Sequence, residues 1–264
     1  MTNKGIIIFS PSKYSLYTLC VAKMCLDQKI PIAGIIVLKL FNFQRFKSEF
    51  RRDGDRLLKK IWKKFFLKEK AYNNKRFNIV NLKQDLNLDD SNIVSFASKN
   101  KIEFIFCDNF NDIKIEKFLK KIKPEIALFT GGGIIKNKII NNFKIGIVNC
   151  HMGLLPDYRG MDVVEWPILE KNFKKLGLTT HLMDTGIDTG KIIQKKEYKL
   201  KSKISIKNIR NDYETLMCNL LIEAYFKLRN NEKLLTQNFS DGKQYFIMHK
   251  KLKHYANMNI RKKK

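Results

Sequence analysis

The chain has 264 residues, of which 44% are hydrophobic and 29% are charged, as expected for a globular protein with a sizeable core. Lys and Arg outnumber Asp and Glu by 52 to 25, and the resulting net charge of +27 favours anionic partners such as nucleic acid, an acidic membrane surface or a phosphorylated metabolite. The five cysteines form no CxxC pair and no apolar run is long enough to cross a bilayer, which argues against a disulfide framework, a structural zinc site and an integral membrane protein.

The first half of the chain alternates predicted strands and helices. Residues 5–9 form a short β-branched apolar run, a helical pattern begins at Ser12, and residues 31–39 repeat the strand signal. The same criteria predict strands at 77–82, 102–107, 125–129 and 144–149, and helices at 89–99 and 112–122. This alternation predicts an α/β fold with an open, doubly wound, mostly parallel sheet, whose ligands lie beyond the carboxyl ends of the strands.

Two regions interrupt the alternation. An insertion at about residues 41–70 is strongly basic and has apolar residues at helical spacing, which predicts a basic amphipathic helix. Packing of its apolar stripe on the sheet is favoured over membrane docking or an anionic-ligand clamp. A long helix is predicted from Ser205 to Leu228, and residues 231–264 are expected to be a loosely attached basic tail. The expected division is one domain over 1–200 and a C-terminal helical extension over 201–264.

Polar residues gather where the predicted strand 144–149 ends. Asn149 and His151 stand at this carboxyl edge, where an open parallel sheet places its ligands. A histidine beside an asparagine is weak evidence alone, because most single histidines are structural. A second polar segment is therefore needed to predict a site.

Residues 178–190 supply this second segment. They place Asp184, Asp188 and two glycines in a turn between two predicted strands, a turn that can bring a carboxylate to the imidazole. The Asp-Thr-Gly sequence within it also occurs in aspartic proteases. Those enzymes need a second copy or a dimer with a β-rich fold, and neither is indicated here.

Together these segments resemble the folate-dependent formyltransferase family, which includes glycinamide ribonucleotide, methionyl-tRNA and amino-sugar formyltransferases. The family pattern Asn-x-His-x-Ser-Leu-Leu-Pro-x-Tyr-Arg-Gly is matched here by Asn149, His151, Leu154, Leu155, Pro156, Tyr158, Arg159 and Gly160. The loop pattern Val-Asp-x-Gly-x-Asp-Thr-Gly is matched by Asp184, Gly186, Asp188, Thr189 and Gly190. The resemblance is strong over about 124–194, and Gly153 replaces the usual Ser.

The resemblance implies that residues 1–200 are a catalytic domain that transfers a formyl group from 10-formyltetrahydrofolate, its co-substrate, to a primary amine without a metal. Asn149 and a protonated His151 are then donors to the carbonyl oxygen that becomes negative, while Asp188 keeps His151 charged and accepts the proton that the amine loses. The implied cofactor-binding residues are Gly131, Gly132, Gly133, Leu155, Asp184, Gly186 and Ile187. The implied substrate-binding residues are Ser10, Tyr158, Arg159, Gly160 and Trp166.

The acceptor amine is less clearly indicated. Family members that act on amino sugars commonly carry a Trp where Trp166 stands, which favours a nucleotide-linked amino sugar, although core packing explains this Trp equally well. The basic charge keeps methionyl-tRNA as an alternative. Glycinamide ribonucleotide loses support because residues 10–15 lack the Gly-Ser-Asn loop of those enzymes. A formyltetrahydrofolate hydrolase and a non-catalytic basic binding protein are less favoured, a cytoplasmic location is expected, and a homodimer is left open.

Overall fold

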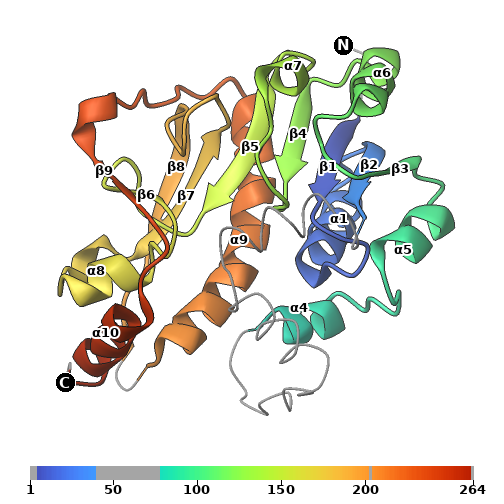
Figure 1. Cartoon of the computed structure of the whole chain (residues 1–264). Coiled ribbons are helices and arrows are strands. Elements are labelled where there is room, and N and C mark those ends of the chain that lie inside the picture. The colour runs from blue at the N-terminus through green and yellow to red at the C-terminus, as the bar shows by residue number, and fades with distance from the viewer. Residues whose placement is uncertain (1–4, 40–77, 202–203, 263–264) are drawn as a thin grey trace.

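A seven-stranded sheet forms the centre of the molecule (Figure 1). The computed structural model describes residues 5–39, 78–201 and 204–262, so the basic helix predicted within 41–70 lies outside the described residues. The strands run in the order β3-β2-β1-β4-β5-β7-β8. In chain order they are β1 (Ile6–Ser10), β2 (Ile32–Leu38), β3 (Phe104–Cys107), β4 (Ile126–Phe129), β5 (Gly146–His151), β7 (Gly177–Leu182) and β8 (Ile192–Glu197).

The sheet is parallel over its first five strands and antiparallel where β5, β7 and β8 pair. Five of the six predicted strands are therefore confirmed, together with the mostly parallel, doubly wound arrangement. The β5 strand extends two residues beyond its predicted end, to His151. Asn149 and His151 are therefore strand residues, separated by the two-residue period that places side chains on one face.

Helices cover both faces of the sheet. Alternate residues of β1 belong to two separate apolar clusters: Ile6 and Ile8 to one, Ile7 and Phe9 to the other. The first cluster is covered by α1 (Leu16–Asp27), α4 (Ile79–Asp85), α5 (Ile93–Lys99) and α9 (Ile206–Arg229). The second is covered by α6 (Ile113–Ile122) and α7 (Asn137–Ile140). Burial on both faces explains why the parallel strands read as continuous apolar runs.

The strand predicted at 77–82 is wrong, because this segment forms helix α4. Asn78 lies just before the helix, and its side chain accepts hydrogen bonds from the backbone of Val80 and Asn81. Such a cap satisfies backbone donors that a helix start leaves without partners. Ile79, Leu82 and Leu86 then pack on the larger cluster at helical spacing, a pattern hidden by the short β-branched run.

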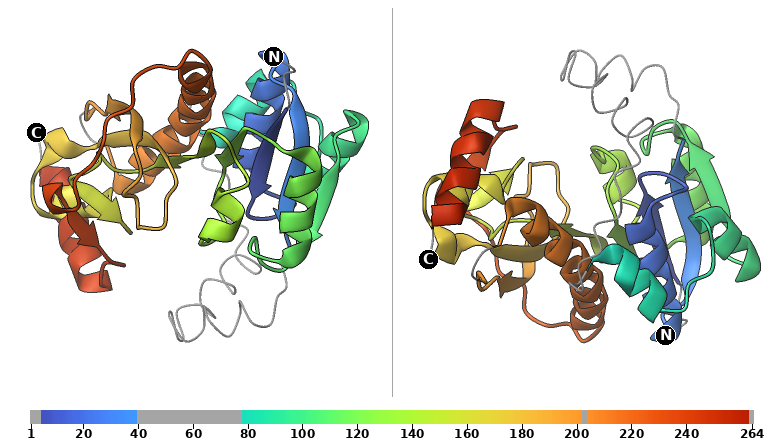
Figure 2. Two further views of the ribbon diagram at one scale, coloured as in Figure 1. Left: turned by 90° about the horizontal axis from the view of Figure 1, so that it is seen from above. Right: turned by 90° about the horizontal axis from the view of Figure 1, so that it is seen from below.

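The expectation of a loosely attached tail after residue 231 is also wrong. The tail contains η2 (Phe239–Asp241), strand β9 (Lys243–Tyr245) and helix α10 (Lys250–Lys262). β9 pairs in parallel with β6 (Tyr158–Gly160), while α10 packs on α8 (Glu165–Leu169), which η1 (Phe173–Lys175) follows. These elements lie together at the end of the molecule opposite β3 (Figure 2). Ala256 and Ile260 of α10 are buried against the core, which explains the docking.

None of the helices in the described part of the chain is both long enough and apolar enough to span a membrane.

Candidate functional site

The end of β5 and the neighbouring strand β7 bring three polar side chains together. The strands pair antiparallel, with Asn149 opposite His181 and His151 opposite Thr179. The Asn149 Nδ2 atom lies 3.1 Å from His181 Nε2, and the rings of His151 and His181 lie edge to face with centroids 6.4 Å apart. His181 lies within residues 178–190, but the sequence did not predict its part in the site, because the register between neighbouring strands is not visible in the sequence.

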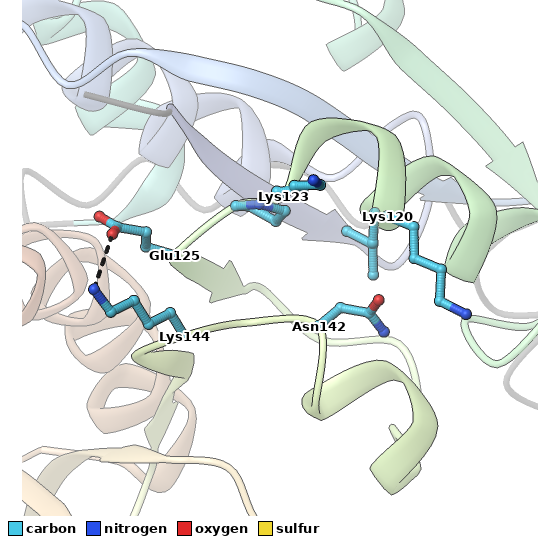
Figure 3. Close-up of a pocket in the computed structure, with 7 residues that line it drawn as sticks. Lys120, Lys123, Glu125, Asn142 and Lys144 are labelled. Carbon is cyan, nitrogen blue, oxygen red and sulfur yellow. Dashed lines mark ion pairs between the residues drawn. The ribbon is translucent and has the colours of Figure 1, made fainter. Parts of the chain in front are cut away.

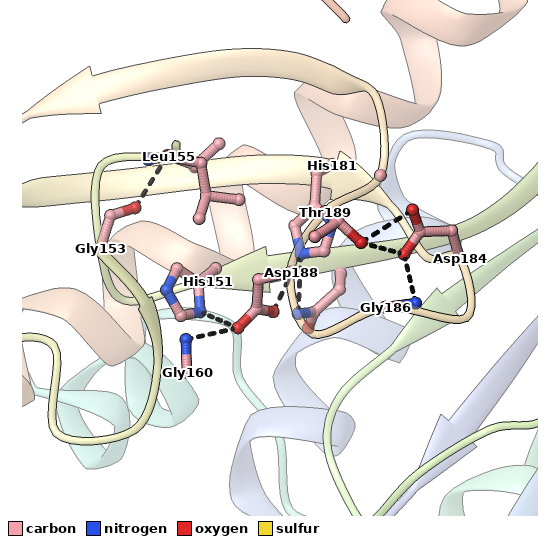
Figure 4. Close-up of polar contacts among 12 residues, drawn as sticks. His151, Gly153, Leu155, Gly160, His181, Asp184, Gly186, Asp188 and Thr189 are labelled. Carbon is pink, nitrogen blue, oxygen red and sulfur yellow. Dashed lines mark hydrogen bonds and ion pairs between the residues drawn. The ribbon is translucent and has the colours of Figure 1, made fainter. Parts of the chain in front are cut away.

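Asp188 reaches the two histidines from the loop between β7 and β8 (Figure 4). Its Oδ2 atom lies 3.4 Å from His151 Nδ1, and its Oδ1 atom lies 3.4 Å from His181 Nε2. The backbone N–H of Gly160 donates to Oδ2 over 2.9 Å. The structure therefore brings all three residues predicted to be catalytic into one contact network, and adds His181 and the Gly160 backbone to it.

Both ring nitrogens of His151 face acceptors. Nε2 donates to the Tyr158 carbonyl over 2.8 Å, and Nδ1 faces the Asp188 carboxylate. Only the doubly protonated ring satisfies both contacts. Burial nevertheless lowers the pKa of His151, and this is the largest effect. Asp188 raises the pKa, His181 lowers it and the hydrogen bond to the Tyr158 carbonyl raises it. Burial thus opposes the effect of the Asp188 carboxylate on His151, and the role of Asp188 in keeping His151 charged stays a prediction.

Asp188 is ionised throughout the physiological range. Burial alone would raise the pKa of its carboxyl, but the two histidines and the Gly160 N–H together lower this pKa to about 2. Its backbone has a φ of 55°, in the left-handed region that residues other than glycine rarely adopt. The surrounding contacts hold the residue in this conformation, a kind of strain that often occurs at functional sites.

Thr179 fixes the turn that follows β5. Its hydroxyl donates to the Gly153 carbonyl over 2.8 Å and accepts from the Leu155 backbone N–H over 3.0 Å. The structure also explains why Gly153 stands where the family usually has Ser. A Cβ atom at this position would lie 2.8 Å from the Tyr158 carbonyl oxygen and 3.0 Å from His151 Nε2, so there is no room for a side chain.

Three predicted cofactor-binding residues lie in the Asp188 loop. The Asp184 carboxylate accepts hydrogen bonds from the Gly186 backbone and the Thr189 hydroxyl, so it organises the loop from within. Ile187 is 49% exposed at the tip. Leu155, another residue of the predicted set, is fully buried and contributes its backbone N–H to the turn.

The three consecutive glycines follow β4, beside the end of β5. Gly131, Gly132 and Gly133 all have φ values between 110° and 123°, which side chains disfavour. A Cβ atom on Gly133 would meet no atom of the described residues within 4 Å. The run thus exposes bare backbone next to the strand that carries Asn149.

Three of the predicted substrate-binding side chains make hydrogen bonds within the protein. Ser10 is fully buried, and its hydroxyl contacts the Ser12 carbonyl and the Thr18 hydroxyl. Arg159 is 3% exposed and donates to the Gly242 carbonyl. The Trp166 indole donates to the Phe246 carbonyl. These side chains therefore have hydrogen-bond partners within the protein, and the ligand contacts expected for them stay a prediction.

A pocket of ≈ 380 Å³ opens at the carboxyl edge of the sheet. Thr130, which follows β4, and Met152, which follows His151, both line it. The Glu214 side chain reaches it from α9, and within the described residues this carboxylate has no hydrogen bond or ion pair. Burial raises the pKa of Glu214, while Arg210 opposes this shift. The remaining lining residues are Ser15, Leu16, Tyr17, Ile79 and Met217.

Another pocket of ≈ 380 Å³ lies at the opposite, amino edge of the sheet, where residues 123–125 lead into β4 (Figure 3). Lys120, Lys123 and Lys144 surround it, and Lys144 lies 4.0 Å from Glu125. Lysines near the end of α6 complement the negative end of the helix dipole, which accounts for two of the three. This pocket is separate from the Asn149 site.

No group of three or more His, Cys, Asp and Glu side chains is placed to hold a metal ion in the described ranges. The five cysteines are free and buried. Burial raises the pKa of Cys20 to about 11 and that of Cys107 to about 12.

The sequence model of the formyl transferase family matches residues 86–225, more than half of the chain, including Asn149, His151 and Asp188. The chain belongs to the formyl transferase family. Among curated relatives of this formyl transferase, the methionyl-tRNA formyltransferase of Thermodesulfovibrio yellowstonii is 32% identical over 121 residues. The match covers 44% of the chain and 39% of that relative, so the chain aligns with less than half of the relative's length.

Solved structures of formyltransferases share the fold of this family member. The N-formyltransferase from Helicobacter canadensis, solved in complex with folinic acid and dTDP-3-aminofucose, has a TM-score of 0.54 at 17% identity, covering 97% of this chain and 80% of its own. The phosphoribosylglycinamide formyltransferase from Bacillus halodurans also has a TM-score of 0.54, at 15% identity, covering 86% of this chain and 95% of its own. These likenesses confirm the predicted fold class.

Proposed function

We propose that this formyl transferase moves a formyl group from 10-formyltetrahydrofolate to a primary amine. The observation that carries the proposal is the contact between Asp188 and His151, 3.4 Å apart, beside Asn149 and within the part of the chain that matches the family. Several groups suit the donor molecule. The glycine run exposes backbone that a flat ring can approach closely, and Ile187 offers an exposed apolar side chain beside the Asp188 loop.

The folate supplies the formyl carbon, and the residues of this chain stabilise the oxygen that becomes negative as the amine attacks. The Asn149 amide has two N–H groups; one is directed to His181, and the other, which makes no hydrogen bond among the described residues, can donate to a ligand oxygen. His151 Nδ1 lies 3.4 Å from Asp188 Oδ2, longer than an ordinary hydrogen bond, so in the protonated ring its N–H can be shared with the same oxygen. Removing one such donor typically lowers the rate ~100 to 1000-fold.

We assign to Asp188 the receipt of the proton that the attacking amine loses. It is ionised at neutral pH because its pKa is about 2, and it lies against His151 rather than in bulk water. A carboxylate with so low a pKa is a weak base, so its main contribution is to favour the charged form of His151 while negative charge develops on the oxygen. An ordered water that contacts Asp188 can relay the proton.

For the acceptor, we propose an amine on a nucleotide-linked amino sugar. The pocket beside Met152 has the Glu214 carboxylate in its wall, which no other described residue pairs by a hydrogen bond or ion pair, and such a group suits sugar hydroxyls or an ammonium. Its ≈ 380 Å³ fits a small molecule. Methionyl-tRNA is the second candidate, favoured by the 32% identity to a methionyl-tRNA formyltransferase and by the net charge of +27.

The test is incubation of the purified chain with 10-formyltetrahydrofolate and a panel of amines, read by product mass and by release of tetrahydrofolate. The panel comprises nucleotide-linked 3- and 4-amino sugars, methionyl-tRNA and glycinamide ribonucleotide. Formylation of one amine supports the proposal and names the acceptor. Release of tetrahydrofolate at the same rate without any amine would instead show a hydrolase, and no release under any condition would show a binding protein.

A further inference from the structure

Residues 234–248, which we call the C-terminal strap, contact both polypeptide segments that surround Asp188. The strap lies beyond the part of the chain that matches the family, which ends at residue 225. It follows α9, crosses the β8 edge of the sheet and leads into α10 (Figures 1 and 2). Its contacts with the site are therefore a property of this chain's tertiary structure, and the matched sequence motifs do not include them.

At its start the strap holds the Asp188 loop. The Gln237 side chain donates through Nε2 to the Asp188 carbonyl over 3.2 Å and to the Gly190 carbonyl over 2.5 Å. Leu235 exchanges backbone hydrogen bonds with Ile192 at the end of the same loop, over 2.8 and 2.9 Å. Asp188, whose carbonyl is one of the two that Gln237 contacts, has the left-handed backbone, so the Gln237 side chain supports the backbone at this strained residue.

At its other end the strap holds the Gly160 turn. In the β6–β9 ladder Gly160 pairs with Tyr245, whose carbonyl accepts from the Met161 backbone N–H over 2.9 Å. The Tyr245 ring stacks on that of Tyr158 at 5.0 Å, and both hydroxyls donate to the Glu170 carboxylate. Tyr158 supplies the carbonyl that accepts from His151, and Gly160 supplies the N–H that donates to Asp188.

There is little free space between the strap and this turn. A Cβ atom on Gly242 would lie 1.7 Å from the Pro156 carbonyl oxygen, and one on Gly160 would lie 2.2 Å from the Tyr245 carbonyl oxygen. Backbone thus packs directly on backbone, which leaves few alternative positions for the strap. A hydrogen bond from Gly160 N–H to Asp188 Oδ2 joins the two held segments.

We propose that the C-terminal strap is a positioning element: by holding the Asp188 loop through Gln237 and the Gly160 turn through β9, it keeps the Asp188 carboxylate against His151. Among the described residues, no hydrogen bond, ion pair or ring stacking joins the strap to either histidine ring, so its effect is expected through Asp188 and Tyr158. The expected effect of the strap on kcat rests on the proposed formyl transfer. The expected effect of the strap on the Asp188–His151 contact does not.

The test compares Gln237→Met with Gln244→Met. Methionine keeps the length of glutamine but cannot donate to the two carbonyls. Gln244 lies on the same strap with an exposed side chain that makes no hydrogen bond among the described residues, so it is a matched control. Gln237→Met should lower kcat about ten- to hundredfold with little change in either KM, because small displacements of positioned groups cost this much. Gln244→Met should match the wild type.

A second measurement does not depend on formyl transfer. His151 faces Asp188, His181 and the Tyr158 carbonyl, and Asp188 raises its pKa. An NMR titration of the imidazole should therefore show a lower His151 pKa in Gln237→Met and in Gly242→Ala, whose added Cβ displaces the strap. If the wild type transfers no formyl group, this titration still tests the strap. An unchanged His151 titration in both folded variants would overturn the proposal.

Discussion

The backbone N–H of Gly160 donates to Oδ2 of Asp188 over 2.9 Å, joining a turn that follows β5 to a loop that follows β7. The same carboxylate lies between His151 and His181, at 3.4 Å from each. Both segments lie within residues 86–225, the part that matches the formyl transferase family. This hydrogen bond orients the carboxylate that contacts both imidazoles.

Replacing Asp188 should remove activity and leave the fold intact. Asp188→Asn is expected to lower kcat at least ~100-fold, because the neutral amide no longer favours the charged form of His151. The His151 pKa should fall further than in the wild type, since Asp188 raises it. Steady-state kinetics and an NMR titration measure the two effects. Asp85→Asn, at an exposed position of α4, is the control. Wild-type turnover in Asp188→Asn would remove this residue from the mechanism.

His181 should affect kcat through its contacts with Asn149 and Asp188. Its Nε2 atom lies 3.1 Å from the Asn149 amide, and a hydrogen bond of this kind contributes about 1 kcal/mol, or roughly a factor of five in rate. His181→Leu should therefore lower kcat by this factor or more. His181→Gln, which keeps a polar group near Asn149, should lose less. Equal kcat values for both variants and the wild type would show that the histidine is only structural.

Stability should fall in acid because of Asp188. Its pKa is about 2 in the folded protein, against an ordinary value of 3.8, so folding favours the ionised form. The stabilisation is fully present above the unfolded pKa and is lost as pH falls through the folded value, between about pH 4 and pH 2. It amounts to about 2 kcal/mol. Urea unfolding of the wild type and Asp188→Asn at pH 6 and pH 3 measures it; the difference between them should shrink at the lower pH.

Restoring the usual family residue at position 153 should destabilise this protein. The Cβ of Gly153→Ser would lie 2.8 Å from the Tyr158 carbonyl oxygen, and such overpacking typically costs about 1–3 kcal/mol. Gly153→Ala adds the same Cβ without the hydroxyl and should lose as much. Thermal unfolding compares the three proteins. If Gly153→Ser proves as stable as the wild type, the turn has more freedom than its contacts indicate.

Glu214 should affect binding of the acceptor amine and leave binding of 10-formyltetrahydrofolate unchanged. Glu214→Gln removes a negative charge from the pocket beside Met152, so the KM for the acceptor amine should rise about tenfold while that for 10-formyltetrahydrofolate stays constant. Glu223→Gln, an exposed position on the same helix, is the matched control. An unchanged acceptor KM would mean that the amine binds elsewhere.

Local pattern in the sequence determined much of this protein. The alternating apolar segments predicted the parallel sheet, because hydrophobic periodicity sets an element's type. A strand end sets where polar groups emerge, which made Asn149 and His151 candidates, but it was the resemblance to the formyltransferase family that joined Asp188 to them. The helix at Ile79–Asp85 was not predicted, since the short apolar run Ile79-Val80 fits either a strand or a helix, and the cap at Asn78 with packing on α1 decided it.

Only the tertiary structure decided the contacts between distant segments. The register of β5 against β7 places His181 opposite Asn149, and docking of residues 234–248 turns an apparent basic tail into support for Asp188. Burial also decided the direction of the His151 pKa shift, which the neighbouring carboxylate alone would have reversed. Strand pairing and desolvation depend on residues that are far apart in the chain, so composition and local spacing cannot predict either of them.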